Sequence, residues 1–482
     1  MKNKISTKAN LLYNMTYQVI ALITPLLTAP YVSRVLGANG VGVYSYYHSI
    51  AIYFVYFAML GLLNYGNRTI AKVREDKVLL NRTFSEIYTL QLITSFVVLL
   101  VYVVFTCFIV NENKLVALIL IFHVISAIFD VSWLFFGLEE FKITSIRQMI
   151  IKIATLIVIF TTVKTRDDLW KYALIMSMGY LISALSLWGL VWKRVSLVRI
   201  DVHALLKHLK PCLILFIPII ATSIYRQMDK IMVGFFSGML QVGYYENAEK
   251  MISISLGIIS AFSAVFLPKI SNLLSNGKRK EANYLFDMSM EFAMCIGIAI
   301  AFGLASIANE FVPFFFGEEF LASTRLLILL SVSIPFITWA NIVRTLHLIP
   351  AEKDKVYVQS IILGAGVNAT INLLLIPRLG AVGAVVGTLF AESSVAIYQT
   401  IKSRKEIRLH IYAKQAAVFC LFGLIMTCFV RVCASIVQWH IWGIVLEIII
   451  GAFVYSILSI VYLCKTDNKI ALDMLRKMKI VR

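Results

Sequence analysis

Residues Asn14 to Arg74 read NMTYQVIALITPLLTAPYVSRVLGANGVGVYSYYHSIAIYFVYFAMLGLLNYGNRTIAKVR and contain most of two apolar segments, approximately 11–36 and 41–63. At a rise of about 1.5 Å per residue, each segment is long enough to cross a hydrocarbon core of about 30 Å. The first segment carries two prolines and Arg34, and the second is rich in tyrosine, which contact with lipid alone would not require. The stretch therefore predicts a helical hairpin through a membrane that handles something polar.

The composition of the whole chain extends this prediction beyond the first hairpin. Of 482 residues, 60% are hydrophobic and 15% are charged, and long apolar runs recur from end to end. We therefore expect an all-α, polytopic membrane protein with about fourteen transmembrane helices. The expected spans lie at approximately 11–36, 41–63, 84–110, 115–137, 143–163, 168–192, 209–236, 241–267, 283–308, 321–348, 357–376, 380–400, 413–435 and 439–464. The seven cysteines are scattered without C-x-x-C spacing, so neither a disulfide framework nor a metal site is expected.

Lysine and arginine are distributed unevenly over the loops between these spans. An even number of spans puts both termini on one side, and the loops on that side carry most of the 45 Lys and Arg residues. The opposite loops carry Lys114, Lys164, Arg166, Lys171, Arg378 and Arg431. Both termini are therefore expected in the cytoplasm. The same asymmetry accounts for most of the formal net charge of +19, so no nucleic-acid partner is inferred.

The second half of the chain repeats a feature of the first half. In the first hairpin, a proline-bearing helix ends near Arg34 and residues 41–44, VGVY, open the next span. In the second half, Lys230 precedes residues 242–245, VGYY, and aligns within about a residue of Arg34 if a few residues are inserted in the second turn. Two parallel six-helix lobes are therefore expected, with chance similarity of two apolar hairpins as the alternative. The expected divisions are 1–200 for the first lobe, 201–408 for the second, and 409–482 for two extra helices and a basic cytoplasmic tail.

Several short motifs resemble one known family. They are PYVSRVLG at 30–37, GVG at 40–42, YF at 53–54, LG at 60–61, YGNR at 65–68, WLFFGLEEFK at 133–142 and DDL at 167–169. These motifs resemble bacterial flippases for O-antigen or capsule repeat units, of the multidrug/oligosaccharidyl-lipid/polysaccharide exporter superfamily. The resemblance implies two six-helix lobes around a central cavity that opens alternately to either face of the bacterial cytoplasmic membrane. It also implies transport of a polyprenyl-pyrophosphate-linked oligosaccharide from the inner to the outer leaflet, with membrane lipids and a polysaccharide polymerase as partners.

Positively charged side chains inside the predicted spans are candidates for binding a pyrophosphate. A charge near mid-span costs about 2.5–3.5 kcal/mol on insertion scales, so its presence requires a wet cavity or a partner. Arginine in addition suits bidentate contacts with phosphate. The candidates are Arg34, Lys152, Arg226, Lys230 and Arg344. The alternative is local pairing, for example of Arg226 with Asp229.

Tyrosine and asparagine side chains inside the spans are candidates for contacting sugars. Tyr53 and Tyr56 lie beyond the interfacial end of their span, where an aromatic ring can stack on a sugar and its hydroxyl can form hydrogen bonds. Asn368 and Asn372 lie one turn apart and could bond either sugar hydroxyls or a neighbouring helix.

Acidic side chains in the spans are candidates for coupling transport to H⁺ or Na⁺, the only cofactors considered. They are Asp229, Glu246, Glu249, Asp130 and Glu291. Structural ion pairs, such as Glu246 with Lys250, are the alternative. His123 is expected to be a hydrogen-bonded core residue rather than a proton relay.

Missing motifs and short outer loops argue against other function classes. The chain has no G-x-x-x-x-G-K-[ST], H-E-x-x-H or D-x-D sequence, and its predicted outer loops leave no domain in which to build an active site. A membrane polysaccharide polymerase is therefore disfavoured, and no enzymatic activity is expected. The main alternative is an ion-coupled exporter of small cationic drugs or metabolites on the same fold. Such an exporter would need an acidic pocket, whereas cations are plentiful in these spans.

Overall fold

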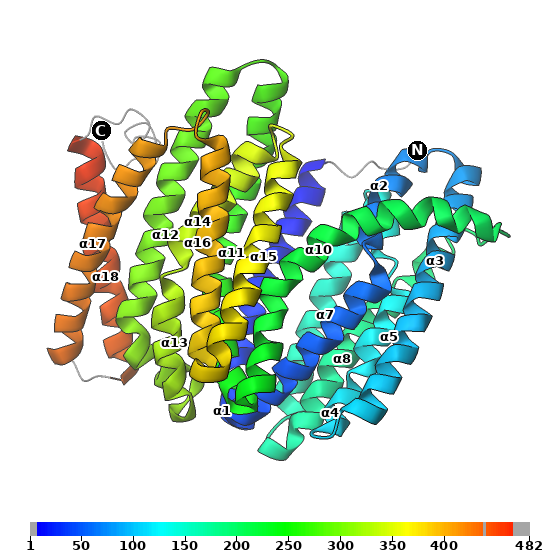
Figure 1. Ribbon diagram of the computed structural model, residues 1–482, viewed down its shortest axis with the longest axis horizontal. Helices are drawn as coiled ribbons and strands as arrows, with labels where there is room; N and C mark the ends of the chain where they lie inside the picture. The colour runs from blue at the N-terminus through cyan, green and yellow to red at the C-terminus, as the bar shows by residue number, and fades with distance from the viewer. Residues whose placement is uncertain (1–6, 437–439, 466–482) are drawn as a thin grey trace. The chain divides into compact units, whose positions relative to one another are not determined.

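The computed structural model describes residues 7–436 and 440–465, and no β-strand occurs within these ranges (Figure 1). Twelve helices in them are long and apolar enough to cross a membrane, or up to 13 if the bent pair Glu318–Ser331 and Ile334–Leu348 is one span. The predicted all-α, polytopic membrane fold is therefore confirmed. The chain divides into two compact units, Met1–Gly243 and Tyr244–Arg482, which we call unit 1 and unit 2.

The helix α1 (Thr7–Met59) contains the first two predicted spans. Gly37 interrupts it with a φ of 68° and a ψ of 176°, a backbone conformation that only glycine adopts without strain. In Figure 1 the blue ribbon of α1 reverses its direction near the α1 label. Counted on either side of Gly37, α1 supplies two spans, and with the bent pair also counted as one span the described residues reach the predicted number of about fourteen.

Unit 1 contains ten complete α-helices within its described residues, besides the π-helical turn Phe105–Ile109 and the 3-10 turn Arg166–Asp168. They are α1, α2 (Leu62–Val73), α3 (Lys77–Val104), α4 (Lys114–Ile119), α5 (Ile121–Phe129), α6 (Ser132–Gly137), α7 (Phe141–Thr162), α8 (Leu169–Leu185), α9 (Trp188–Val191) and α10 (Val202–Ser237). The short helices α4, α5 and α6 together form one candidate span, Lys114–Gly137. Figure 1 shows the first part of α10 lying across the end of the bundle before the helix turns along it. Pro211 lies in this helix, where a proline removes a hydrogen bond and favours a bend.

Two of the sequence motifs pack against each other in the core of unit 1. A Cβ atom at Gly66, in the YGNR motif, would lie 2.7 Å from the ring of Trp133, in the WLFFG motif. The Trp133 side chain is fully buried, and its Nε1 donates a hydrogen bond to Gln91 Oε1 at 2.9 Å. Likewise, a Cβ atom at Gly137 would lie 2.6 Å from Ile70. These motif residues therefore hold α2 against α6.

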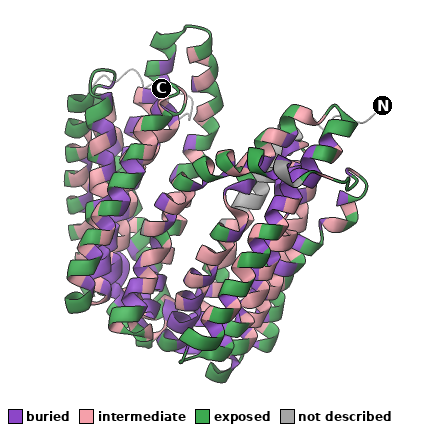
Figure 2. Ribbon diagram, turned by 45° about the vertical axis from the view of Figure 1, so that its right-hand side comes forward, coloured by how far each residue is buried: buried purple, intermediate pink, exposed green. Residues whose placement is uncertain are grey.

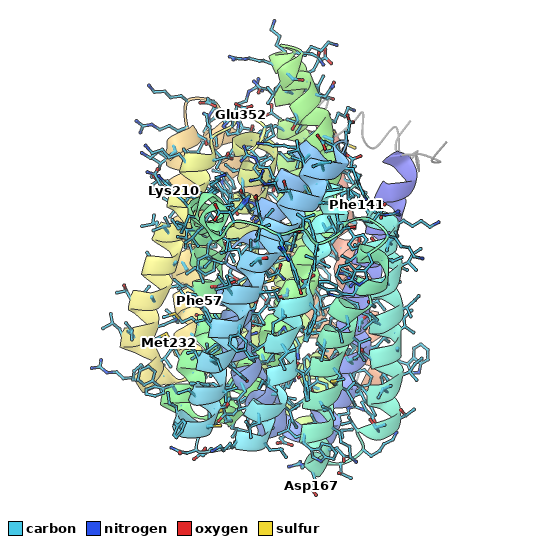
Figure 3. The ribbon with its side chains drawn as sticks, turned by 90° about the vertical axis from the view of Figure 1, so that its right-hand side faces the viewer. Phe57, Phe141, Asp167, Lys210, Met232 and Glu352 are labelled. Atoms are coloured by element: carbon cyan, nitrogen blue, oxygen red, sulfur yellow. The ribbon has the colours of Figure 1, made fainter. Side chains whose placement is uncertain are left out.

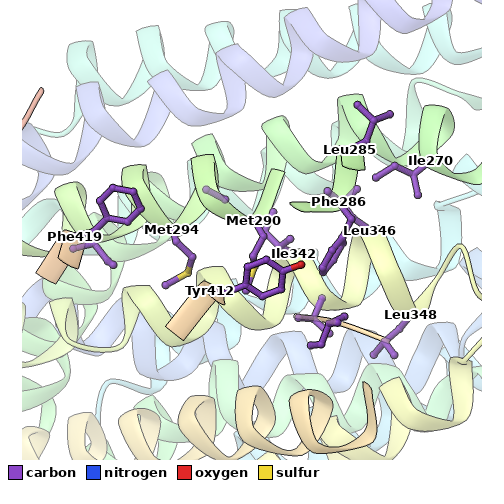
Figure 4. Close-up of a cluster of buried hydrophobic side chains, with 14 of the residues drawn as sticks. Ile270, Leu285, Phe286, Met290, Met294, Ile342, Leu346, Leu348, Tyr412 and Phe419 are labelled. Carbon is purple, nitrogen blue, oxygen red and sulfur yellow. The ribbon is translucent and has the colours of Figure 1, made fainter. Parts of the chain in front are cut away.

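Unit 2 begins within α11 (Met239–Ser275) and contains the remaining helices. They are α12 (Arg279–Phe316), α13 (Leu321–Ser331), α14 (Ile334–Val343), α15 (Asp354–Leu379), α16 (Ala381–Ser403), α17 (Leu409–Ile436) and α18 (His440–Lys465). Figure 4 shows part of the core of unit 2, where Met290 and Met294 of α12 lie near Ile342 of α14 and Tyr412 of α17. In the same unit, α17 and α18 pair with each other and with α12.

The exposed faces of the helices are rich in large apolar side chains. Phe96 on α3, Leu424 on α17 and Phe453 on α18 are each more than half exposed. Figure 2 shows exposed residues following the outer faces of the helices. Because a water-soluble protein would not expose such continuous apolar faces, these surfaces are expected to contact lipid.

The turns that precede the two VG sequences correspond residue by residue. Gly37 and Gly238 both have a positive φ, of 68° and 86°. A Cβ atom at Gly42 would lie 1.7 Å from Met239 O, and a Cβ atom at Gly243 would lie 1.9 Å from Ala38 O. Ala38 corresponds to Met239 and Gly42 to Gly243 at the same separation in the sequence. Each glycine therefore contacts the counterpart of the residue that the other glycine contacts, as a two-fold relation requires.

This reciprocal contact supports the predicted internal repeat and revises its register. No insertion is needed in the second turn, and Arg34 then corresponds to Phe235 rather than to Lys230. The predicted lobe boundary at residue 200 is a division by helix number and stays a prediction. In the structure α10, the first helix of the predicted second lobe, lies in unit 1.

Candidate functional site

The facing surfaces of α1 and α10 bring together five of the residues predicted from the sequence. We call Tyr53, Tyr56, Arg226, Asp229 and Lys230 the α1–α10 cluster. In Figure 3, Phe57 of α1 and Met232 of α10, which flank this cluster in the sequence, lie between the ends of unit 1 that Lys210 and Asp167 mark.

Hydrogen bonds fix the register of the two helices at the cluster. The Tyr53 hydroxyl donates to Ser223 O at 3.0 Å, and the Ser49 hydroxyl donates to Gln227 Oε1 at 3.1 Å. Further along, Gly234 allows the ring of Tyr46 to approach, since a Cβ atom there would lie 2.2 Å from Tyr46 Cδ2. The residue types at 49, 53, 227 and 234 therefore position the cluster.

The charges of the cluster differ in their exposure. Arg226 is exposed and Lys230 is half-buried, and both act electrostatically on the Tyr56 phenol. Asp229 is only 1% exposed and acts on Tyr53 instead. The cluster therefore exposes Arg226, leaves Lys230 and the two tyrosines half-buried, and keeps its carboxylate buried. Such a surface can bind an anion and the hydroxyls or ring faces of a sugar.

The other predicted cations lie elsewhere. Arg34 is exposed on α1, three residues before the break at Gly37, and Tyr31 anchors this part of the helix by donating to Val163 O at 2.6 Å. Lys152 is half-buried on α7. In unit 2, Arg344 opens the π-helical turn Arg344–Leu348 with its guanidinium 5.7 Å from the centre of the Tyr357 ring.

The predicted sugar-contacting asparagines are fully buried in unit 2. Asn372 Nδ2 donates to Asn368 Oδ1 at 3.0 Å. A Cβ atom at Gly387 of α16 would lie 2.0 Å from Asn372 Oδ1, so the glycine lets α16 approach the amides closely. The hydrogen bond between the two asparagines lies within α15, so a bond to a neighbouring helix and a contact with sugar both stay predictions.

The remaining acidic candidates have local partners. Asp130 accepts a hydrogen bond from Ser132 N at 3.0 Å, and Glu246 lies 3.1 Å from Lys250 Nζ. Glu291 is 7% exposed and accepts from Gln415 Nε2 at 2.9 Å. Glu249 is half-buried on α11. These contacts are structural, and a role in ion coupling stays a prediction.

Sequence reasoning missed two polar groups. Arg431 Nη1 lies 2.9 and 2.8 Å from the two carboxylate oxygens of Glu310, and Glu447, 2% exposed, interacts electrostatically with both residues. The signal for this group was the presence of charged residues inside three spans near the end of the chain.

In unit 1, His123 is buried as predicted, but its ring stacks on Tyr180 and His48 at 4.0 and 5.2 Å between centroids. The isolated histidines inside two spans were the signal for this stack.

The helical spans define a polytopic membrane protein, and the cluster on α1 and α10 gives it exposed cationic and half-buried phenolic side chains within the predicted spans. The chain matches the family described as "Polysaccharide biosynthesis protein" over residues 7–274, and it belongs to that family. The resemblance found in the sequence motifs is therefore confirmed.

Relatives and solved structures agree with this assignment. The chain is 24% identical over 401 residues to the "Putative O-antigen transporter" of Escherichia coli (strain K12), covering 82% of this chain and 93% of the relative. It is 23% identical over 197 residues to "Lipid II flippase MurJ" of Bacillus subtilis (strain 168), covering 40% of this chain and 35% of the relative.

Two solved structures share the fold. A structure titled "Lipid II flippase MurJ, inward closed conformation" superposes with a TM-score of 0.76 at 17% identity, covering 95% of this chain and all of that one. An inward-facing multidrug resistance MATE family transporter superposes with a TM-score of 0.55 at 15% identity, covering 82% and 99%. Both are similar in fold.

Proposed function

We propose that this protein is a flippase for lipid-linked oligosaccharides. It moves a repeat unit carried on polyprenyl pyrophosphate from the inner to the outer leaflet of the bacterial cytoplasmic membrane, for surface polysaccharide synthesis. Both termini are cytoplasmic in this proposal, because the lysine and arginine residues concentrate on that side. Relatives named as an O-antigen transporter and a lipid II flippase support the substrate class.

The observation that carries the proposal is the exposure of Arg226 beside Lys230 and Tyr56. A diphosphate carries about two negative charges, and leaving them unpaired in a low-dielectric cavity would cost several kcal/mol. Fixed cations on α1 and α10 would offset this cost, and the tyrosines would contact the adjoining sugars. Arg34 and Lys152 are proposed as further cations on the route.

Alternating access is the proposed mechanism. The head group would load from the cytoplasm and leave on the outer side, while the polyprenyl tail stays in lipid. Protonation or Na⁺ binding at Asp229, Glu246 or Glu249 is proposed to reset the cycle, since these acids lie on α10 and α11.

The leaflet in which the lipid-linked repeat unit collects in a deletion strain tests the proposal. Accumulation in the inner leaflet, relieved by the wild-type gene and not by an Arg226→Gln variant, supports flipping. The Lys164→Gln variant, which removes an exposed cation at the outer end of α7, is the matched control and should complement fully. Unpolymerised units in the outer leaflet would identify a polymerase instead. Normal polysaccharide with altered drug resistance would identify the drug exporter.

A further inference from the structure

A large polar cavity lies in unit 2, and its lining includes none of the residues named in the proposed function. Its volume is about 1220 Å³. The end of α11, the start of α12 and the segments around residues 350 and 405 line it. Figure 3 labels Glu352, which lies on this lining, at one end of the molecule. All of these connections are on the side that the distribution of lysine and arginine assigns to the cytoplasm.

Three lysine or arginine side chains and two carboxylates line the cavity. One lysine and one carboxylate among them form an ion pair with each other. Lys353 Nζ donates to Glu406 Oε1, and His347 Nε2 lies 3.2 Å from the other oxygen of this carboxylate. The hydrogen bond from Lys353 holds the pKa of the Glu406 carboxyl below its ordinary value, so the carboxylate stays charged and neutralises the lysine.

The remaining two cations of the lining are Arg279 and Lys405. In the ranges that the structure describes, neither has a recorded ion pair with a carboxylate, although Arg279 acts electrostatically on Glu406. Only Glu352 is left to oppose them on the cavity wall. Lys280 and Arg404 in the adjoining connections add further positive charge, whereas Lys278 pairs with Glu281 and Arg408 lies 3.6 Å from Asp287. The cavity therefore has a positive potential towards the cytoplasm.

The other lining groups suit a ligand with a polar head and a larger body. Ser271 and Asn283 can donate hydrogen bonds, and Phe286 and Pro350 offer apolar surface. The cavity volume of about 1220 Å³ lies somewhat above the range for small-molecule sites, about 300–1,000 Å³, so it exceeds the need of a bare ion. An arginine in such a wall matches the geometry of phosphate oxygens.

We propose that this cavity is a cytoplasmic binding site for a phosphate-bearing molecule, held by Arg279 and Lys405. The phosphate belongs either to a soluble phosphate ester or to the head group of an anionic lipid, which share this chemistry. None of the residues proposed for transport belongs to the lining of this cavity.

Titration of the full-length protein with inorganic pyrophosphate, in nanodiscs of phosphatidylcholine, tests the proposal by calorimetry. Arg279→Gln and Lys405→Gln should each weaken binding by about tenfold or more, since hydrogen bonds to charged groups contribute about 1.5–3 kcal/mol. Their matched controls are Lys278→Gln and Lys402→Gln. Lys278 pairs with Glu281 at 3.1 Å and Lys402 lies 5.5 Å from the Tyr398 ring centre, and neither lines the cavity. The controls should bind within about twofold of wild type.

Three results would overturn the proposal. They are the absence of saturable binding by the wild-type protein, equal losses in all four variants, and loss of binding in Arg226→Gln, which would assign the anion to the α1–α10 cluster. Nanodiscs enriched in phosphatidylglycerol distinguish the sources. A lipid occupant would weaken pyrophosphate binding by competition in wild type but not in Arg279→Gln. If the occupant is soluble, the ratio of the pyrophosphate affinities of wild type and Arg279→Gln should be the same in both kinds of nanodisc.

Discussion

The α1–α10 cluster of unit 1 and the asparagine pair of unit 2 are both polar groups inside membrane spans, and they differ in exposure. Arg226 faces outward from α10, whereas Asn368 and Asn372 are 0% exposed between α15 and α16. From the sequence alone, both groups are candidates for a transport site, because both lie inside predicted spans. Their surroundings separate them, because Gly387 closes α16 over the amides while nothing comparable covers Arg226.

This difference suggests that exposure, more than residue type, separates transport residues from packing residues in this protein. A buried polar residue should affect stability when it is changed, because its partner is left unsatisfied. An exposed cation should affect transport and leave stability unchanged. The following variants test that division, from the largest expected effect to the smallest.

Arg226→Gln should lower transport by about 100-fold, since two charge-assisted hydrogen bonds to a phosphate would be lost. Its thermal midpoint in detergent should match wild type, because the side chain is exposed. Arg226→Lys should recover part of the activity, since a point charge replaces a bidentate donor. Transport of lipid-linked repeat units into the outer leaflet of vesicles is the measurement. Unimpaired transport in Arg226→Gln would remove the cluster from the substrate route.

The comparison assumes that α1 keeps its register against the end of α10, and Gly42 tests this. A Cβ atom there would lie 1.7 Å from Met239 O, a clash with backbone that cannot rotate away. Gly42→Ala should therefore lower the free energy of unfolding by about 3 kcal/mol. Gly189→Ala is the control, because no atom lies within 4 Å of the added Cβ. Equal thermal midpoints for the two variants would contradict the close contact at this turn.

Unit 1 also holds a buried polar network, which should behave like the asparagines of unit 2 and not like Arg226. The Tyr65 hydroxyl lies 2.6 Å from His208 Nδ1, and His208 Nε2 lies 2.9 Å from Glu86 Oε2. His208→Ala should destabilise the protein by about 1–3 kcal/mol by leaving these groups unsatisfied. Chemical denaturation measures the change, and Arg82→Gln, which removes the exposed partner of Glu86, should cost less. If Arg82→Gln lowered the free energy of unfolding more than His208→Ala, the exposure of a contact would not determine how much it stabilises the protein.

Asn372→Ala provides the direct counterpart to Arg226→Gln. Loss of the hydrogen bond to Asn368 should lower stability by about 1–2 kcal/mol, with transport per folded molecule unchanged. Transport normalised to folded protein, measured at a temperature well below the midpoint, distinguishes the two roles. Lost transport at wild-type stability would restore Asn372 as a sugar-contacting residue.

The sequence predicted the helices well because membrane spans are encoded locally, by about 20 consecutive apolar residues. The first hairpin shows this, since both of its spans were predicted and Gly37 marks the break between them. The bend between α13 and α14 could have been expected from Pro335, near the start of α14.

The candidate site was less predictable because burial depends on residues far away in the sequence. Local pattern gave no sign that Gly387 would close over Asn372, or that Glu310 and Arg431 would meet. The register between repeats was also misjudged at Arg34, because it depends on the reciprocal turn contact of Gly42 and Gly243.

The smallest effect is expected at an exposed ion pair of unit 2. The Lys353 hydrogen bond keeps the pKa of Glu406 below its ordinary value of 4.5, so the pair adds stability above that pH. This contribution should be present above about pH 5 and should disappear as the pH falls through the lowered pKa. Glu406→Gln should therefore be slightly less stable than wild type near neutrality and should converge with it under acid conditions. Glu406 is 47% exposed, so the difference should be well below that of Asn372→Ala. Denaturant titrations at several pH values measure it, with Lys353→Gln closing a double-mutant cycle. A gap that persists below the lowered pKa, where the carboxylate is protonated, would exclude the ion pair as its cause.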